Sequence, residues 1–452
     1  MAAILVGTQS CSSSIPPRAQ LVVFVDTDLA TRSQAADDLA FSRDVSVDSV
    51  RVEVMDEAGD VSDSRDFVAP DPLAWPISFG IAPNTDSSPQ LLRLRVFSAA
   101  TATPSLIDGQ STVEPLAVTT IDRVVRLPLA TSGVSAVHVL LAGDCIGRPA
   151  SFANGISSCV DADHLSAPPS MDLGATSDLT PPASVVGTWP LAREVPCSGT
   201  PNVTNAVCVP GGVSLLGDPV LDHLIGFDTS PRRLVQVSPF FMDRTEMTVE
   251  VYRSLLSTGK VTEIPAPDPY DPDSDACDFS GKGNLPINCL SHDGFSAACT
   301  ARGGSLPTEA QWEHAARGRG QSRRFPWGDQ DPSCCVACTA KEQGCNGSLD
   351  PAGSSPARPA VCDGIGDQSR DGILDLGGSL IEFTRDTYAP YDSSCWAWNG
   401  LRKDPLCTVS GLPAVRGGSW SGGFNTMASV LRKPEPAGGS AVGARCVYPG
   451  SP

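Results

Sequence analysis

The chain has little positive charge for its size. Its 452 residues include 32 Lys and Arg against 51 Asp and Glu, which gives a net charge of −19 at pH 7 and a pI of about 4.6. A protein that binds nucleic acid neutralises phosphates with clustered Lys and Arg. The sequence has no such cluster, so nucleic acid is excluded as a partner, and the acidity is typical of a solvated surface.

Long apolar segments are also missing. Beyond the first residues, no run approaches the ~18 apolar residues that a membrane-spanning helix needs. Residues 1–18 resemble the remnant of a secretory signal or a disordered leader, because a short apolar stretch runs into Cys11 and three serines. Lipidation of Cys11 would then anchor the chain. We therefore expect an exported protein in the periplasm, on the outer membrane as a lipoprotein, or at the cell surface.

Cysteine, in contrast, is plentiful, with 16 residues. A structural zinc site needs two ligand pairs at tetrahedral-site spacing, and Cys335-x-x-Cys338 has no second such pair and no nearby His. Disulfides are the favoured interpretation and imply an oxidising compartment. Cys145 and Cys159 bracket a loop short enough for a local disulfide.

The sequence divides into two folded parts. Between residues 19 and 164, short runs with period-two alternation are separated by turn clusters, which predicts an all-β antiparallel sandwich. Residues 165–200 are rich in Pro and Ser and lack a hydrophobic period, as in a linker. Residues 201–452 form a second domain, in which helical periodicity is limited to 248–257 and 308–317. Thr308 and Gln311 form a capping box at the start of the second helix.

Five blocks of the second domain, in order, carry a resemblance to a known family. They are PGGVSLLGD at 210–218, VSPFFMDRTEMT at 237–248, GGSLPTEAQWEHAARG at 303–318 with FPWGD at 325–329, DGILDLGGSLIEFTRD at 371–386, and RGGSWSGGFNTM at 416–427 with GARCV at 443–447. Together they resemble the formylglycine-generating, or sulfatase-modifying factor, family. The resemblance implies an α+β fold overall: a loop-rich, C-type-lectin-like domain at the C-terminus, preceded by the sandwich.

The same resemblance shows what chemistry is missing. Family members that oxidise a sulfatase cysteine bind copper through two cysteines after the Gly-Gly-Ser-aromatic run, and thiolates suit Cu(I). Those positions are Gly422 and Met427 in this chain. Of the pocket residues only Ser419 is retained, since Ile381 and Ala441 replace a tryptophan and an asparagine. We expect no copper and no catalytic residues.

Two other metals follow from the resemblance. An iron-dependent branch needs converging histidines, and the five here are scattered, with packing the favoured role for His314. Calcium is expected at the glycine-rich turn through the side chains of Asp375 and Glu382 and the carbonyls of Gly378 and Leu380. The alternative is that Asp375 caps a turn and Glu382 pairs with Arg445 or Arg416.

The sequence thus favours a binding or interaction module over an enzyme. The expected ligand, a protein, peptide or glycan, would lie in a groove formed by Ser419, Trp420, Phe424 and Asn425, beside the cysteine loop 334–345. The competing interpretation is a formylglycine-generating-type oxidase, or a related oxygenase, with atypical metal ligands.

Overall fold

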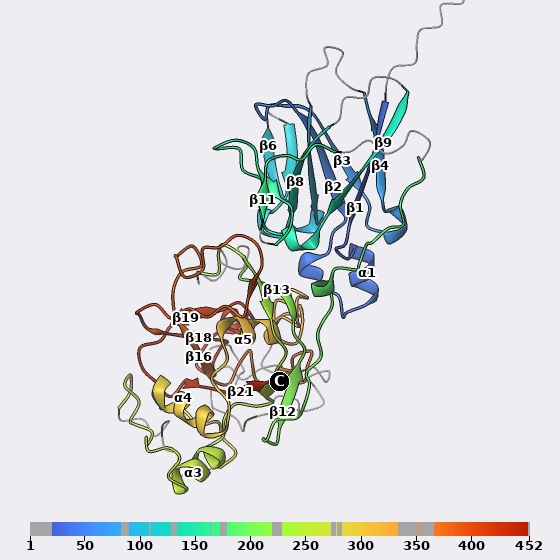
Figure 1. Ribbon diagram of the computed structural model, residues 1–452. Coiled ribbons are helices and arrows are strands. Elements are labelled where there is room, and N and C mark those ends of the chain that lie inside the picture. Colours follow the sequence, from blue (N-terminus) through green and yellow to red (C-terminus); the bar gives the residue numbers. More distant parts are fainter. Residues whose placement is uncertain are drawn as a thin grey trace, which may run out of the picture.

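The computed structural model describes residues 20–82, 90–107, 110–127, 133–162, 164–171, 179–218, 228–272, 277, 283–332, 352 and 366–450. Cys11 and the cysteine loop 334–345 lie outside these residues, so the predictions made for them are not addressed. The protein is a mixed α/β molecule of mostly strands and loops, with a strand-rich N-terminal part above a C-terminal part that holds the longer helices (Figure 1).

Two larger sheets make up the body of the N-terminal part, beside the two-stranded sheets β6-β7 and β10-β11. One has the order β4-β1-β9, with β1 Gln20–Thr27, β4 Ile77–Ile81 and β9 Val134–Leu141. The other has the order β3-β2-β5-β8, with β2 Ser49–Met55, β3 Val61–Val68, β5 Leu91–Phe97 and β8 Ile121–Arg126. The second sheet is antiparallel, as predicted. The purely antiparallel prediction is wrong for the first, because β1 pairs with β9 in parallel, and alternation along a strand does not determine the direction of its neighbour.

Strand alternation explains how the two sheets meet. Val50 and Val52 of β2 and Leu92 and Leu94 of β5 are buried in one hydrophobic cluster together with Val23 of β1. The smaller elements of this part lie between and around the strands. They are α1 Arg32–Asp37, η1 Arg43–Val45, η2 Pro72–Ala74, η3 Ala99–Thr101, β6 Thr103–Ile107, β7 Gln110–Glu114, η4 Ala117–Thr119, η5 Gly143–Cys145, β10 Ser158–Cys159 and β11 Leu165–Ser166.

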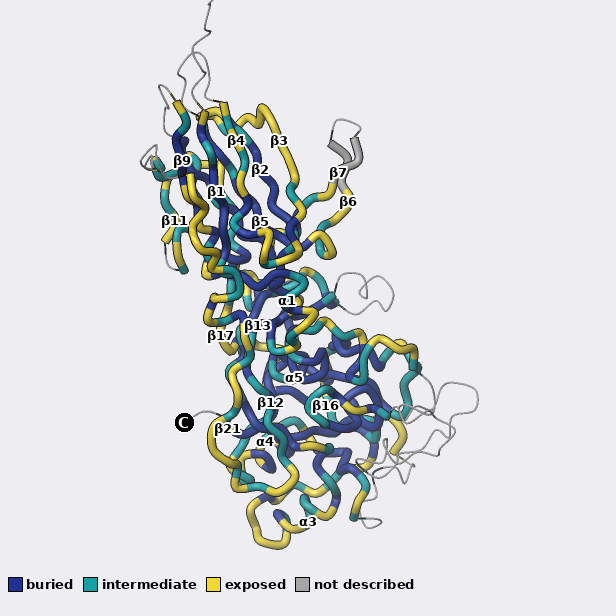
Figure 2. The backbone as a smooth tube through the Cα atoms, turned by 90° about the vertical axis from the view of Figure 1, so that its right-hand side faces the viewer, coloured by how far each residue is buried: buried dark blue, intermediate teal, exposed yellow. Residues whose placement is uncertain are grey.

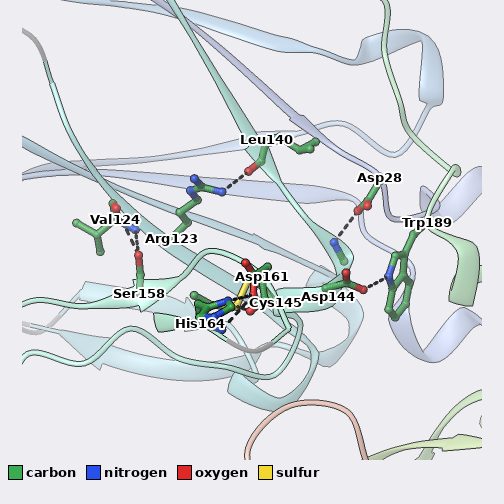
Figure 3. The surroundings of a disulfide bond; sticks show 12 residues. Asp28, Arg123, Val124, Leu140, Asp144, Cys145, Ser158, Asp161, His164 and Trp189 are labelled. Atoms are coloured by element: carbon green, nitrogen blue, oxygen red, sulfur yellow. Dashed lines mark hydrogen bonds and ion pairs between the residues drawn. A yellow bond between two sulfur atoms is a disulfide. The ribbon is translucent and has the colours of Figure 1, made fainter. Parts of the chain in front are cut away.

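The end of the segment predicted to be a linker is bonded to the N-terminal part. Trp189 is 2% exposed and its Nε1 donates to Oδ1 of Asp144 at 2.8 Å, beside the Cys145–Cys159 disulfide that the spacing predicted (Figure 3). The backbone N–H of Val185 donates to Asp26 at 2.8 Å. A short 3-10 turn, η6 Pro190–Ala192, follows. These contacts fix the path of the chain into the second part.

Three small sheets form the C-terminal part. Their orders are β12-β15-β21, β13-β14-β17 and β19-β18-β16-β20. The strands are β12 Ala206–Val209, β13 Gly212–Leu216, β14 Arg233–Val237, β15 Phe240–Asp243, β16 Ile381–Thr387, β17 Arg402–Lys403, β18 Pro413–Arg416, β19 Arg432–Pro434, β20 Val442–Gly443 and β21 Val447–Pro449. The last family block, residues 416–427 with 443–447, is called the closing motif below; it begins at the end of β18 and resumes at the end of β20. These two strands flank β16 on its two sides, so residues distant in sequence meet on one sheet.

Two of the helices confirm the sequence prediction and one corrects it. Helix α3, Val249–Ser257, is capped by Thr248, and α5, Glu309–Ala316, has the Thr308–Gln311 capping box. Helix α4, His292–Ala301, was not predicted. Its Ser291 cap is clear in the sequence, but small residues and a glycine weaken its apolar periodicity. Packing of Phe295 and Ala298 in the core stabilises it instead.

Disulfides fasten the loops between these elements. The described residues contain Cys145–Cys159, Cys197–Cys208, Cys277–Cys289, Cys299–Cys446 and Cys395–Cys407. Cys299–Cys446 ties α4 to the closing motif across a separation of 147 residues. Disulfides are thus confirmed for these ten cysteines, and they indicate the oxidising environment typical of exported proteins. Cys335 and Cys338 lie outside the described residues. Within the described ranges, no helix has the length and apolarity to cross a bilayer.

The two parts share an interface built on Asp44. Its Oδ2 accepts from the backbone N–H of Leu215 at 2.9 Å, its Oδ1 accepts from the hydroxyl of Ser322, and its own N–H donates to the carbonyl of Gly320 at 3.1 Å. Leu215 also belongs to the same hydrophobic cluster as the sandwich valines. The core of the N-terminal part therefore continues into β13 (Figure 2).

Candidate functional site

The groove predicted from the closing motif begins at two glycines. A Cβ on Gly417, whose φ is +81°, would lie 2.6 Å from the carbonyl oxygen of Leu376, and one on Gly418 would lie 2.4 Å from that of Gly377. The N–H of Trp420 then donates to the carbonyl of Ser379 at 2.6 Å. The closing motif is thereby pressed against the glycine-rich turn of residues 375–380, because only glycine permits this approach.

The four groove residues differ in exposure. Ser419 is buried, with its hydroxyl 3.1 Å from that of Ser421, whereas Trp420 and Phe424 are half-buried and Asn425 is exposed. Trp420 donates its indole N–H to the carbonyl of Ser440 at 3.1 Å, which fixes its ring. A ligand at this loop would therefore contact the two aromatic rings and the Asn425 amide.

Gly422 and Met427, the two positions that the resemblance assigned to copper ligands, lie in a tight turn and an apolar cluster. Met427 has 0% of its surface exposed and packs in a small cluster with Phe325, Ala428 and Val430, which Trp327 and Phe424 flank. At Gly422 an added Cβ would lie 2.4 Å from Oγ1 of Thr426. Apolar packing and a tight turn occupy the space in which two thiolates would be needed.

Trp327 was not named as a site residue from the sequence. Its ring stacks on Phe325 with centroids 5.0 Å apart and planes 2° apart, and it lies against Gly377, where a Cβ would come within 2.7 Å of it. It remains half-buried next to Phe424. The block at 325–329 was a signal for the family, but nothing in the sequence places this ring beside the groove.

Two buried carboxylates hold the glycine-rich turn. Oδ2 of Asp367 accepts from the N–H groups of Gly377 and Gly378 at 2.7 and 3.0 Å. Glu246 accepts from the N–H of Leu380 at 2.9 Å and from the Ser379 hydroxyl at 3.1 Å. Both carboxylates are buried, with Asp367 0% and Glu246 2% exposed.

Burial changes the acidity of these groups. It raises the pKa of Asp367 to about 8, with the charge of Asp375 adding to the effect, and Oδ1 of Asp367 has no hydrogen-bond partner in the described part of the chain. Burial, and then the charge of Asp375, also raises the pKa of Glu246 well above its usual value. Asp375 itself is 3% exposed and has a φ of 60°. The turn thus concentrates carboxyl groups that resist ionisation.

Glu382 is engaged by protein donors. Arg445 donates to it through Nε at 2.8 Å and through a terminal nitrogen at 2.5 Å, and the indole of Trp312 donates at 2.8 Å. A calcium ion at Asp375, Gly378, Leu380 and Glu382 would have to share this carboxylate with a guanidinium. Among the described residues, no group of three or more His, Cys, Asp and Glu is arranged to hold a metal. Calcium at this turn stays a prediction.

Helix α5 carries a second buried acidic group beside the site. Glu309 accepts from Arg416 at 2.9 Å and from Arg432 at 2.8 Å, and Glu313 accepts from Arg416 at 2.8 Å. Burial alone would raise the pKa of Glu309, but the two guanidiniums hold it below its usual value. Arg416 also donates to the hydroxyl of Tyr391 at 2.8 Å. These bonds fix the position of α5 behind the closing motif.

The described histidines do not converge. His314, 1% exposed, donates from Nε2 to the Pro210 carbonyl at 3.0 Å and accepts at Nδ1 from Ser214, 2.5 Å away. Burial lowers its pKa to about 4. His292 contacts the carbonyl of Thr384 at 2.9 Å, while His138 and His164 belong to the N-terminal part. His314 therefore packs and hydrogen-bonds, as predicted, and His223 lies outside the described residues.

The fold and these residues define a disulfide-fastened domain of the formylglycine-generating type. A family model described as "Sulfatase-modifying factor enzyme 1-like domain" matches residues 192–449, which is more than half of the chain. The chain therefore belongs to the family of the sulfatase-modifying factor enzyme 1-like domain.

Curated relatives include both enzymes and an inactive protein. The chain is 28% identical over 183 residues to the formylglycine-generating enzyme of Streptomyces coelicolor, covering 33% of this chain and 56% of that one. It is 27% identical to the mouse "Inactive C-alpha-formylglycine-generating enzyme 2", covering 41% and 69%. It is 26% identical to the hercynine oxygenase of Mycolicibacterium smegmatis, covering 50% and 56%. The chain spans about half the length of the two enzymes.

Proposed function

We propose that this protein is an exported binding module whose sulfatase-modifying-factor domain recognises a protein, peptide or glycan without oxidising it. The environment of Met427 and Gly422 is the observation that carries this proposal. Copper chemistry of the formylglycine-generating kind needs two soft ligands. Here a buried thioether in an apolar cluster and a glycine stand at those positions.

The exposed part of the same loop supports recognition. Trp420 and Phe424 present partly accessible rings beside the exposed amide of Asn425, with Trp327 next to them. Aromatic rings give a large contact area at low conformational cost, and an amide supplies both a donor and an acceptor. Such a surface on a scaffold fastened by disulfides suits binding without chemistry.

Metal content and aldehyde formation test the absence of oxidation. We expect the protein, purified without chelators, to contain no stoichiometric copper or iron and to leave a synthetic cysteine-containing peptide unchanged. The Streptomyces coelicolor formylglycine-generating enzyme serves as the positive control in the same assay. Stoichiometric copper that is lost on Ser419→Ala, or aldehyde product, would contradict the proposal.

Binding to peptide and glycan arrays tests the recognition surface. Asn425→Arg places a long charged side chain over the rings and should abolish binding of any ligand that the wild-type chain retains. Asp331→Arg places the same side chain at another exposed position, where Asp331 forms an ion pair with Arg324, and should leave binding intact. Equal losses in both variants would show that the groove is not the binding surface.

The alternative is an oxygenase or oxidase with atypical ligands, which the likeness to hercynine oxygenase over 252 residues favours. It requires ligands other than the cysteine pair. The described histidines lie apart, so such a site would have to draw on other side chains. Iron retained through purification and released by substitution of one histidine would favour this alternative over a binding module.

A further inference from the structure

Strand β3, Val61–Val68, lies at the edge of its sheet and is the most exposed strand of the sandwich (Figure 2). All but one of its eight residues are exposed, with Val61 at 50% and Val68 at 78%. It contains neither glycine nor proline. Among the described residues, only β2 pairs with it. A long edge strand of this kind is a template for pairing with another strand.

The pairing with β2 shows which way the β3 side chains point. Asp63 lies opposite Val54, and Arg65 lies opposite Val52, so both charged residues share the face of the core valines. Phe67 lies on that face as well. Asp63 and Arg65 form an ion pair of 3.4 Å, and their side chains are 56% and 73% exposed. The inward face of this edge therefore carries one charge of each sign, two residues apart.

These side chains overhang a hollow between the two edge strands β3 and β4. The hollow has a volume of about 310 Å³ and is lined by Val52, Val54, Phe67, Phe79 and Ile81 together with Asp63 and Arg65. Phe67 and Phe79 stack across it with ring centroids 5.5 Å apart. The sandwich is thus open on this side, with partly buried apolar side chains at the opening.

Symmetry limits how β3 can pair with itself. In a symmetric antiparallel pair, the two-fold axis is normal to the sheet, and paired residues point to the same face. One residue must therefore lie directly opposite its own copy, and this residue is called the centre of the register. Centres at Asp63, Arg65 and Asp66 each place a charged residue opposite its own copy, and like charges directly opposite are destabilising.

A centre at Ser64 matches opposite charges. It places Asp63 opposite Arg65 of the second copy, and the same pair occurs again by symmetry. A bulge between Val61 and Asp63 turns Val61 to the face of Met55, so the match rests on the residues around Ser64. Charged residues that point inward on an edge strand normally prevent pairing. Here their opposite signs favour this register, because no other centre at residues 62–67 places Asp63 or Arg65 opposite a residue of opposite charge.

We propose that β3 is a homodimerisation edge, on which a second copy of this chain pairs antiparallel with the two-fold axis at Ser64 and joins the two four-stranded sheets. Asp63 and Arg65 of both copies form a ring of alternating charge. The inward-facing side chains of the second copy cover the open side of the hollow beside Phe67. This proposal is independent of the function proposed for the C-terminal groove.

Reciprocal charge reversal tests the register. The full chain should sediment as a dimer over a concentration series, and Asp63→Arg and Arg65→Asp should each raise the dissociation constant by at least about tenfold, because both cross-strand pairs become like-charged. An equimolar mixture of the two variants restores both Asp–Arg pairs and should give a heterodimer as tight as the wild type. The double variant D63R/R65D should also dimerise like the wild type.

Both substituted side chains are more than half exposed, so the variants should keep the wild-type unfolding midpoint. A wild-type chain that stays monomeric overturns the proposal, as does a dimer that ignores both single variants. Variants that dissociate but fail to recombine on mixing would also overturn it. A chain that is monomeric until an extended peptide or a glycan is added would assign the edge to that other occupant.

Discussion

Two buried acidic groups lie on opposite sides of the closing motif and behave differently. Around α5, Glu309 and Glu313 share Arg416 and Arg432, and the pKa of Glu309 is held below its usual value despite complete burial. At the glycine-rich turn, Arg445 bonds to Glu382, while burial raises the pKa of Glu246 and Asp367. Burial is common to both groups, so the number of guanidiniums within reach decides which carboxyls ionise.

The largest effect should follow from removing a guanidinium at α5. Arg416→Met leaves Glu309 with one partner and Glu313 without its 2.8 Å bond, at positions that are almost fully buried. Loss of one partner of a buried pair costs about 3–5 kcal/mol of unfolding free energy. Unfolding in guanidinium chloride at pH 7 measures this loss of unfolding free energy.

Arg324→Met is the matched control, because its partner Asp331 is largely exposed, and it should cost less than about 1 kcal/mol. Similar losses in the two variants would mean that the α5 network contributes no more than a surface pair does.

Calcium should have the next largest effect, because a cation would supply positive charge at the glycine-rich turn. If calcium binds through Asp375 and its neighbours, adding it at a hundred times its dissociation constant should raise the unfolding free energy by ~2.7 kcal/mol. Asp375→Asn should remove this response, and Asp331→Asn should not. A stability unaffected by calcium and chelator would rule out the ion and leave Arg445 as the counter-charge at Glu382.

The pH dependence of stability should show the unpaired carboxyls directly. Asp386 of β16 is also buried and accepts from the backbone N–H groups of Glu309 and Cys407. Because burial raises the pKa of Asp367 to about 8 and that of Asp386 to about 7, the folded state holds protons that the unfolded state has lost above pH 4. Stability from these groups is complete below their unfolded pKa and is lost as the pH rises through the folded values. The unfolding free energy measured in urea should therefore fall between pH 6.5 and 8, by up to ~1.4 kcal/mol per pH unit for each group.

Asp367→Asn keeps an oxygen for the N–H groups of Gly377 and Gly378 and carries no charge, so it should reduce this slope. Asp331→Asn is the exposed control. An unchanged slope in Asp367→Asn would show that Asp367 ionises normally in the folded protein.

His314, a buried base with neutral hydrogen-bond partners, should have the smallest effect on stability. Its pH dependence has the opposite sign to that of the buried carboxyls. Its folded pKa of about 4 lies below the usual value, so its stability contribution is present above pH 6.5 and is lost as the pH falls toward 4. His314→Asn should reduce the loss of stability on acidification from pH 6.5. If His314→Asn loses as much unfolding free energy on acidification as the wild type, the loss comes from carboxyl groups that are ionised in the folded state.

Several features could be predicted from local sequence. The family blocks identified the C-terminal domain, and the Thr248 and Thr308 caps located α3 and α5, because a cap and its hydrogen bonds lie within one turn of helix. The Cys145–Cys159 bond followed from its spacing. The position of Trp327 beside the groove could not be predicted, since it depends on Gly377, about fifty residues further along the chain.

The sequence by itself determined the family, the glycine and methionine at positions 422 and 427 and the alternation that builds the sandwich, because each of these is a property of residues close together in the chain. Tertiary structure alone decided that β1 pairs with β9 in parallel, that Asp367 is buried under the glycine-rich turn, and that Glu382 bonds to Arg445. These outcomes depend on which distant segments share one low-dielectric interior, where the free energy of a charge is set by its neighbours in space.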